Sequence, residues 1–142
     1  MGRNGLGGSG RGTPSVNSTG HGRILVVAAS PINRIVISRM VERVYFKAIA
    51  VAPEAALDAL ATKSPSLVIV DGGGHGDLDG LMSSIISQRQ AQAKDLPRIV
   101  LIIEPSQQDS LSYEGVVDAV VAKPITPEAL QPVVERLTRD AI

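Results

Sequence analysis

Short runs of aliphatic and β-branched residues alternate along this chain with longer stretches in which apolar residues recur every three or four positions. The runs have the length and composition of buried strands, and the longer stretches have the period of helices with one apolar face. This alternation is typical of a parallel sheet covered by helices on both faces, so the predicted fold class is α/β. The predicted strands are 24–27, 47–51, 67–70, 99–103 and 118–122.

Capping residues mark where two of the intervening helices begin. Ser30 followed by Pro31 supplies a capping hydroxyl and a proline at the first helical position, and Thr126-Pro127 repeats this signal. Pro132 has no N–H, so it should kink the last helix or delay its start. The predicted helices are 31–44, 53–62, a stretch that follows Gly72–Gly74 and runs to about 92, a marginal one over 106–114, and a last one capped at Thr126.

Five strands joined by right-handed crossovers admit few arrangements, and the commonest doubly wound order for a domain of this size is 2-1-3-4-5. Sheets of this kind bind ligands beyond the carboxyl ends of the strands, where the strand order reverses. That point lies between the first and third strands, so the residues to consider are Ala28 and Ala29 after the first strand and Asp71 after the third.

Asp71 is the first candidate for a functional side chain, because a carboxylate at the end of a buried strand is costly unless it has a partner or a role. Lys123 follows the fifth strand and should lie across the same end of the sheet, within reach of Asp71. Two plainer interpretations stay open, which are a turn aspartate before glycines and a structural ion pair.

Composition narrows the class of protein. The 142 residues are 44% hydrophobic, which allows one globular core, and we place it at 23–142 behind a disordered Gly/Ser-rich tail at 1–22. Lysine plus arginine and aspartate plus glutamate number 14 each, so no net charge favours nucleic acid or a membrane surface. The chain has no cysteine, no apolar run that spans a bilayer and no signal-peptide core, and we expect a cytoplasmic protein.

The order and spacing of these features resemble the receiver domain of bacterial response regulators over residues 23–142. The matching segments are Arg23–Val27, Ser30–Arg34, Leu67–Asp71, Asp79–Leu81 and Lys123-Pro124. The resemblance implies a flavodoxin-like (βα)5 fold and a part in two-component phosphorelay signalling rather than an enzymatic activity. In that family an aspartate after strand three accepts a phosphoryl group from a kinase histidine, two acidic residues after strand one hold magnesium, and a lysine contacts the phosphoryl oxygens. By position, Asp71 and Lys123 take the first and third roles, and the Lys123–Pro124 peptide would be cis.

This chain departs from the family at four positions. The acidic pair falls on Ala28 and Ala29, the hydroxyl residue of strand four on Ile102, and the aromatic switch residue of strand five on Val120. Magnesium prefers several oxygen ligands, so it should bind weakly or not at all, and no other cofactor is expected. We therefore expect an atypical receiver that signals by protein contact, with weak or no magnesium-dependent phosphorylation.

Two alternatives stay open. One is a working phosphoacceptor at Asp71 with an altered metal site, to which Glu104 or, more remotely, Asp77 could contribute an acid, although the plainer interpretation of both is a solvated loop acid. The other is a flavodoxin-like enzyme or nucleotide binder, although Ala28-Ala29-Ser30-Pro31 is no phosphate-cradling loop. His21 and His75 lie apart from other ligands and are interpreted as surface residues.

The first helix has two apolar stripes. Ile32, Ile35, Val36 and Met40 are predicted to face the core, which leaves a candidate partner surface at Ile37, Val41 and Val44. In the family this helix docks the helical bundle of a kinase, so the expected partner is a sensor histidine kinase, another signalling protein or a second copy of the chain. The plainer interpretation is packing under neighbouring loops. With no output domain after the last helix, we expect the chain to act on another molecule, either free-standing or as the terminal receiver of a hybrid kinase.

Overall fold

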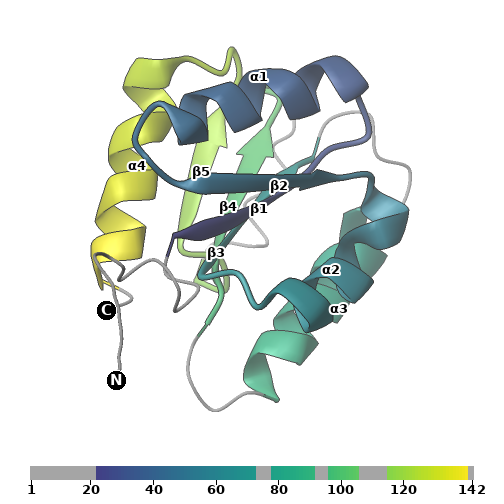
Figure 1. The fold of residues 1–142 in the computed structure, drawn as a ribbon. Coiled ribbons are helices and arrows are strands. Elements are labelled where there is room, and N and C mark those ends of the chain that lie inside the picture. Colours follow the sequence, from purple (N-terminus) through teal and green to yellow (C-terminus); the bar gives the residue numbers. More distant parts are fainter. Residues whose placement is uncertain (1–21, 73–77, 92–95, 106–114, 141–142) are drawn as a thin grey trace, which may run out of the picture.

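The computed structural model describes residues 22–72, 78–91, 96–105 and 115–140. Five parallel strands form one sheet in the order β2-β1-β3-β4-β5, as the sequence predicts (Figure 1). The strands are β1 (Arg23–Val27), β2 (Lys47–Val51), β3 (Leu67–Asp71), β4 (Arg98–Ile103) and β5 (Ala119–Ala122). The helices are α1 (Pro31–Glu42), α2 (Ala56–Lys63), α3 (Leu78–Gln90) and α4 (Pro127–Asp140), and a short 3-10 helix, η2 (Pro53–Ala55), precedes α2.

Several sequence predictions fall on other parts of the chain. The tail up to His21, the marginal helix over 106–114, and the side chains of His75 and Asp77 lie outside the described residues. Within the described ranges, no helix combines the length and the apolar character needed to cross a bilayer.

The sheet separates two hydrophobic clusters, because successive residues of a strand face opposite sides. Ile24 and Val26 of β1 belong to the cluster under α1 and α4, whereas Leu25 and Val27 belong to the cluster under α2 and α3. All four are fully buried, as expected for a parallel strand covered on both faces. In Figure 1, α1 and α4 accordingly lie on one side of the sheet and α2 and α3 on the other.

Both predicted capping residues cap the first turn of a helix in the structure. The backbone N–H of Asn33 donates to Oγ of Ser30 at 3.2 Å, and α1 begins at Pro31. The backbone N–H of Ala129 donates to Oγ1 of Thr126 at 3.2 Å, and α4 begins at Pro127. Pro132 lies inside α4, so the expectation of a late start is wrong: the cap at Thr126 fixes the first turn ahead of the proline.

The two faces of α1 are the reverse of the prediction, except that Met40 is buried as predicted. Ile37 and Val41 are fully buried and Val44 packs against the same cluster, so these residues are not a partner surface. Ile32 and Ile35 are instead 71% and 57% exposed. Helical spacing identifies a stripe but not the side that meets the sheet. The buried stripe is the more complete one, because Ile37, Met40, Val41 and Val44 follow the full i, i+3, i+4, i+7 pattern.

The chain leaves α1 through a left-handed residue. The backbone N–H of Tyr45 donates to the carbonyl of Glu42 at 3.0 Å, and Tyr45 has φ of 74° with its side chain almost fully exposed. A side chain with a Cβ is disfavoured in this conformation, which glycine usually supplies at helix ends. The end of α1 is therefore a strained turn.

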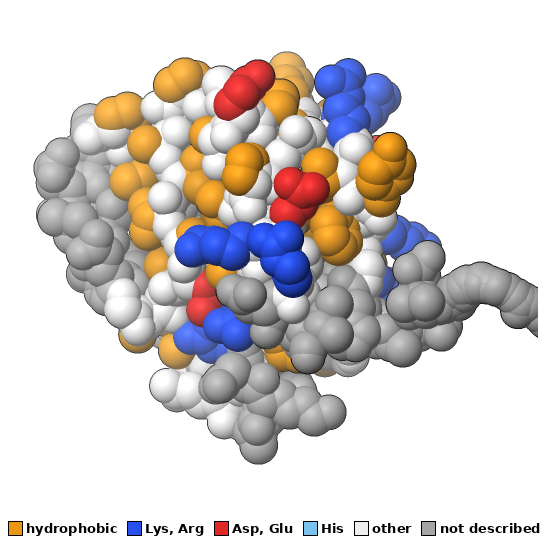
Figure 2. Space-filling view, turned by 90° about the vertical axis from the view of Figure 1, so that its left-hand side faces the viewer, with side chains coloured by type: hydrophobic (Ala, Val, Ile, Leu, Met, Phe, Trp, Pro, Cys, Tyr) orange, Lys and Arg blue, Asp and Glu red, His pale blue; other side chains and the backbone are white. Residues whose placement is uncertain are grey.

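The side of the molecule on which α4 lies carries charges of both signs. Figure 2 shows hydrophobic side chains spread over its upper part with acidic groups among them, and lysine and arginine side chains gathered near its middle. The chain has no net charge, and on this face acidic and basic side chains are mixed rather than separated into large patches of one sign.

Candidate functional site

The candidate site lies at the carboxyl ends of the strands, which meet at one edge because the sheet is parallel. Asp71 is the last residue of β3 and lies opposite Ile102 of β4. Ala28 follows β1, which pairs with β3, and Lys123 follows β5, which pairs with β4. The ends of four separate strands thus bring these residues to one edge of the sheet, as the strand order predicts.

Asp71 is a buried carboxylate with partners at both oxygens. Its side chain is fully buried, and the ammonium nitrogen of Lys123 lies 3.0 Å from Oδ1. The side-chain amide of Asn33 donates to Oδ2 at 2.8 Å. A buried charge is tolerated when it is both paired and hydrogen-bonded. The predicted contact between Asp71 and Lys123 is present, while the chemical roles of the two residues stay predictions.

Asn33 is the site residue that sequence reasoning missed. It lies in the first turn of α1, where its backbone already bonds the capping Ser30. A helix that begins just after β1 places its first turn beside the end of β3, since β1 and β3 are neighbours. This proximity is the signal that could have identified Asn33, because a polar side chain there faces the carboxylate at the strand end.

Lys123 lies between two acids. Its nitrogen is 3.9 Å from Oε1 of Glu104 in addition to the contact with Asp71. The Glu104 side chain is 41% exposed, so this second contact is the more solvated one. The backbone N–H of Lys123 donates to the carbonyl of Ile103 at 2.9 Å, and the Lys123–Pro124 peptide is cis, as the family resemblance implies.

Ala28 and Ala29 provide no side-chain oxygen at this edge of the sheet. Ala28 is fully buried, and its carbonyl accepts a hydrogen bond of 2.7 Å from Arg34. Its N–H donates to the carbonyl of Val51 at 3.2 Å, so both backbone groups of Ala28 are used within the fold. In the ranges that the structure describes, no group of three or more His, Cys, Asp or Glu side chains is arranged to hold a metal ion.

The two predicted switch positions carry hydrocarbon in different surroundings. Ile102 is fully buried in the cluster under α1 and α4, and its carbonyl accepts a hydrogen bond of 2.8 Å from the N–H of Gly72. A Cβ on Gly72 would lie 3.0 Å from this carbonyl oxygen, a tight contact, so the close approach of the two backbones favours glycine. Val120 lies on β5 and is 38% exposed. Neither side chain can form a hydrogen bond with a ligand bound beside Asp71.

Comparison with known proteins identifies relatives in structure only. No protein-family model matches the chain, and no curated protein matches it. The receiver domain of NtrX from Brucella abortus is 21% identical, with a TM-score of 0.70, and the alignment covers 82% of this chain and 98% of that one. The receiver domain of a signal transduction histidine kinase from Syntrophus aciditrophicus is 21% identical, with a TM-score of 0.68 and coverage of 84% and 91%.

The chemotaxis response regulator CheY4 of Vibrio cholerae gives a similar match. It is 19% identical, with a TM-score of 0.68, and the alignment covers 81% of this chain and 97% of that one. Identities this low show a shared architecture, and the strand order agrees with it. The chain therefore has the flavodoxin-like fold of response-regulator receiver domains.

Proposed function

We propose that this chain is a receiver-type module of two-component signalling that acts by contact with another protein and takes little or no phosphoryl group at Asp71. The observation that carries the proposal is the state of this carboxylate. Its side chain is fully buried, and its oxygens already contact Lys123 and Asn33. An attacking oxygen must be able to reach the phosphoryl donor, so the burial of Asp71 and the hydrogen bond from Asn33 to its Oδ2 favour a structural role over a nucleophilic one.

The groups beside Asp71 do not suit the coordination of magnesium, the ion that the fold family implies. Magnesium prefers octahedral oxygen coordination and is usually held by one or two carboxylates together with phosphate. Ala28 and Ala29 have no side-chain oxygen, and the carbonyl of Ala28 already accepts from Arg34. Lys123 provides a positive charge at Asp71 instead. A single ammonium group gives less stabilisation than a divalent ion to the charge of a transferring phosphoryl group.

Output in this proposal does not depend on a switch between two states. The hydrocarbon side chains of Ile102 and Val120 offer no hydroxyl or aromatic ring through which a phosphoryl group could change the surface. The partner, a sensor histidine kinase or another signalling protein, would find one constant surface. The candidate surface is the exposed side of α1 outside the groove between α1 and β2, where Ile32 and Val36 follow the i, i+4 spacing of helix docking.

A second candidate function is a working phosphoacceptor site. The observation in its favour is that Asp71 and Lys123 keep a contact of 3.0 Å at the carboxyl end of the sheet. Glu104, whose carboxylate is 3.9 Å from Lys123, would then partly replace the missing acidic pair. In that case Asp71 would have to exchange its contact with Asn33 for the incoming group.

An amide NMR titration with magnesium and then beryllofluoride, an acyl-phosphate mimic, separates the two functions. The contact-module proposal expects no saturable shifts at Asp71, Ala28 or Lys123. Saturable shifts centred on these residues would contradict it and support the phosphoacceptor. The Asp71→Asn variant is the matched control, because it removes the charged acceptor but keeps the size of the side chain. Shifts that persist in this variant come from ion binding elsewhere.

A further inference from the structure

β2 is an outer strand of the described sheet, and two of its five residues are alanines. In a parallel pair, alternate residues of a strand form the hydrogen bonds to its neighbour. In β2, the N–H of Lys47 donates to the carbonyl of Gly22 at 2.6 Å, and the carbonyl of Val51 accepts from the N–H of Ala28 at 3.2 Å, so the odd-numbered residues face β1. The backbone groups of Ala48 and Ala50 therefore point away from β1. Their methyl side chains do not shield the edge, and no charged residue or proline interrupts β2 after Lys47.

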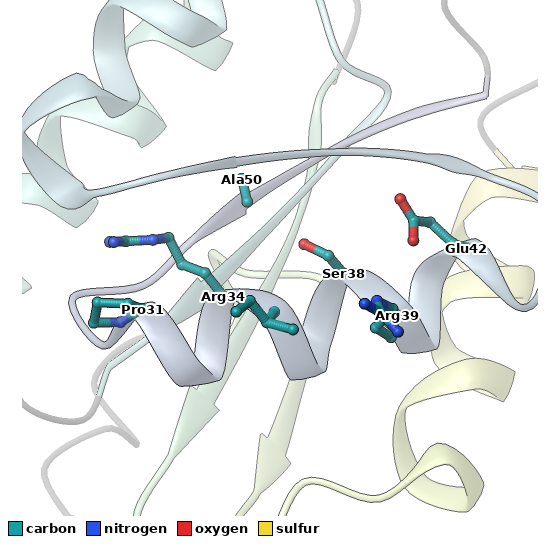
Figure 3. Close-up of a pocket in the computed structure, with 7 residues that line it drawn as sticks. Pro31, Arg34, Ser38, Arg39, Glu42 and Ala50 are labelled. Atoms are coloured by element: carbon teal, nitrogen blue, oxygen red, sulfur yellow. The ribbon is translucent and has the colours of Figure 1, made fainter.

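A groove of about 450 Å³ runs between α1 and this strand. Figure 3 shows Ala50 on the β2 side, with the Ser38 hydroxyl and the Glu42 carboxylate pointing from α1 towards β2. The Arg34 side chain lies on the same wall, nearer the N-terminal end of α1. Ile35, also in the wall, is 57% exposed. The groove thus combines an open strand edge with exposed apolar and charged groups.

Opposite charges lie toward the two ends of the groove, Arg34 at one and Glu42 at the other, with Arg39 between them along α1. Arg34 and Glu42 each lie one helical turn from Ser38, on opposite sides of it. Within the described ranges neither forms an ion pair, and the Oγ atom of Ser38 is buried without a hydrogen-bond partner. A two-fold axis near Ser38 would bring Arg34 of one copy to Glu42 of another. A strand from another protein whose charged side chains all had the same sign would be attracted at one end of the groove and repelled at the other.

We propose that a second copy of this chain occupies the groove. The two β2 strands run antiparallel across the two-fold axis, with Ala48 of one copy opposite Ala50 of the other, so that their outward N–H and C=O groups bond in pairs. Arg34 of each α1 then pairs with Glu42 of the other copy, at the two ends of the groove. The contact is isologous and therefore closes as a dimer. It does not depend on whether Asp71 accepts a phosphoryl group.

Charge reversal in the full chain tests the ion pairs, with sedimentation velocity as the readout. Arg34→Glu and Glu42→Arg should each weaken dimerisation about tenfold, because each places two like-charge contacts in the dimer. The double variant R34E/E42R should restore it. Arg34 also donates to the carbonyl of Ala28, and restoration in the double variant separates the ion pair from this internal role. Arg43→Glu is the matched control, because Arg43 is an exposed residue at the end of α1 outside the groove.

Ala50→Pro tests the strand pairing. Proline is tolerated in an edge strand where its N–H would point outwards, so this variant should keep the circular dichroism spectrum and lose the dimer. A full chain that stays monomeric at about 1 mM overturns the proposal. So does a dimer that survives both single charge reversals, or a folded double variant that remains as weak as the single ones. We expect the unmodified chain and the Arg43→Glu variant to dimerise equally well. The two single charge reversals should dimerise more weakly, and the double variant should recover the dimer.

Discussion

The ammonium nitrogen of Lys123 lies 3.0 Å from Oδ1 of Asp71, and the carboxylate that it contacts is fully buried. Lys123 itself keeps 19% of its side chain exposed, so the two partners differ in their access to water. Removing one is therefore not equivalent to removing the other, because the residue that is left behind is either a solvated cation or a buried anion.

Lys123→Met should lower the free energy of unfolding by about 2–4 kcal/mol, because it removes the cation that lies against the buried Asp71 carboxylate. Adding Asp71→Asn should recover part of this loss by removing the charge. Urea denaturation of the three proteins measures the differences. Lys63→Met, at an exposed position of α2, is the control. A Lys123→Met variant as stable as this control would show that the pair contributes nothing.

Gly72→Ala should destabilise the protein by about 1–3 kcal/mol, because overpacking forces the backbone to move. The added Cβ would lie 3.0 Å from the carbonyl oxygen of Ile102, which cannot move away without disturbing β4. Gly22→Ala has no atom within 4 Å of the new Cβ and should change stability by less than about 0.5 kcal/mol. Thermal melts of the pair decide the matter, and equal melting temperatures would contradict the close approach at Gly72.

The exposure of the two α1 stripes predicts opposite results for two similar substitutions. Ile37→Ala should lower stability by about 2–5 kcal/mol, because Ile37 is fully buried in the cluster under α1 and α4. Ile35→Ala should cost less than about 0.5 kcal/mol, since that side chain is largely exposed. Chemical denaturation measures both. A larger loss at Ile35 than at Ile37 would mean that α1 is rotated from its position in the structure.

Tyr45→Gly should raise the free energy of unfolding by about 1 kcal/mol, because glycine adopts the left-handed conformation without a steric penalty. Tyr45→Ala keeps the Cβ and tests the side chain alone, so it should leave stability nearly unchanged. The two variants can be compared by their denaturation midpoints. Should Tyr45→Ala gain as much as Tyr45→Gly, the backbone conformation is not the cause.

Strands and strand order could be predicted because burial on both faces leaves a clear signal. Runs such as Leu67–Val70 contain only aliphatic residues, and few topologies connect five such runs through crossovers. The meeting of Asp71 and Lys123 followed from that order, since parallel strands bring their carboxyl ends to one edge. Local capping at Ser30 and Thr126 was equally readable, because it depends on residues close in sequence.

The orientation of a helix was harder to predict than the spacing of its apolar residues. Ile32 and Ile37 are both apolar residues of one helix, and only the packing of α1 against β1 and α4 decides which of them is buried. The contact of Asn33 with Asp71 depends in the same way on how the first turn of α1 sits beside β3. The groove beside Ala50 arises because β2 is an outer strand, and sequence patterns alone do not define its depth.

The Asp71 carboxylate joins three segments that are distant in the chain, which are the first turn of α1, the end of β3 and the residue after β5. Release of this one side chain would break its contacts with Asn33 and Lys123 together. Amide hydrogen exchange at the start of α1 and after β5 should therefore proceed through one shared opening rather than two independent ones. The carboxyl edge of the sheet would then behave as a single cooperative unit, which keeps α1 and β5 in a fixed relation to each other.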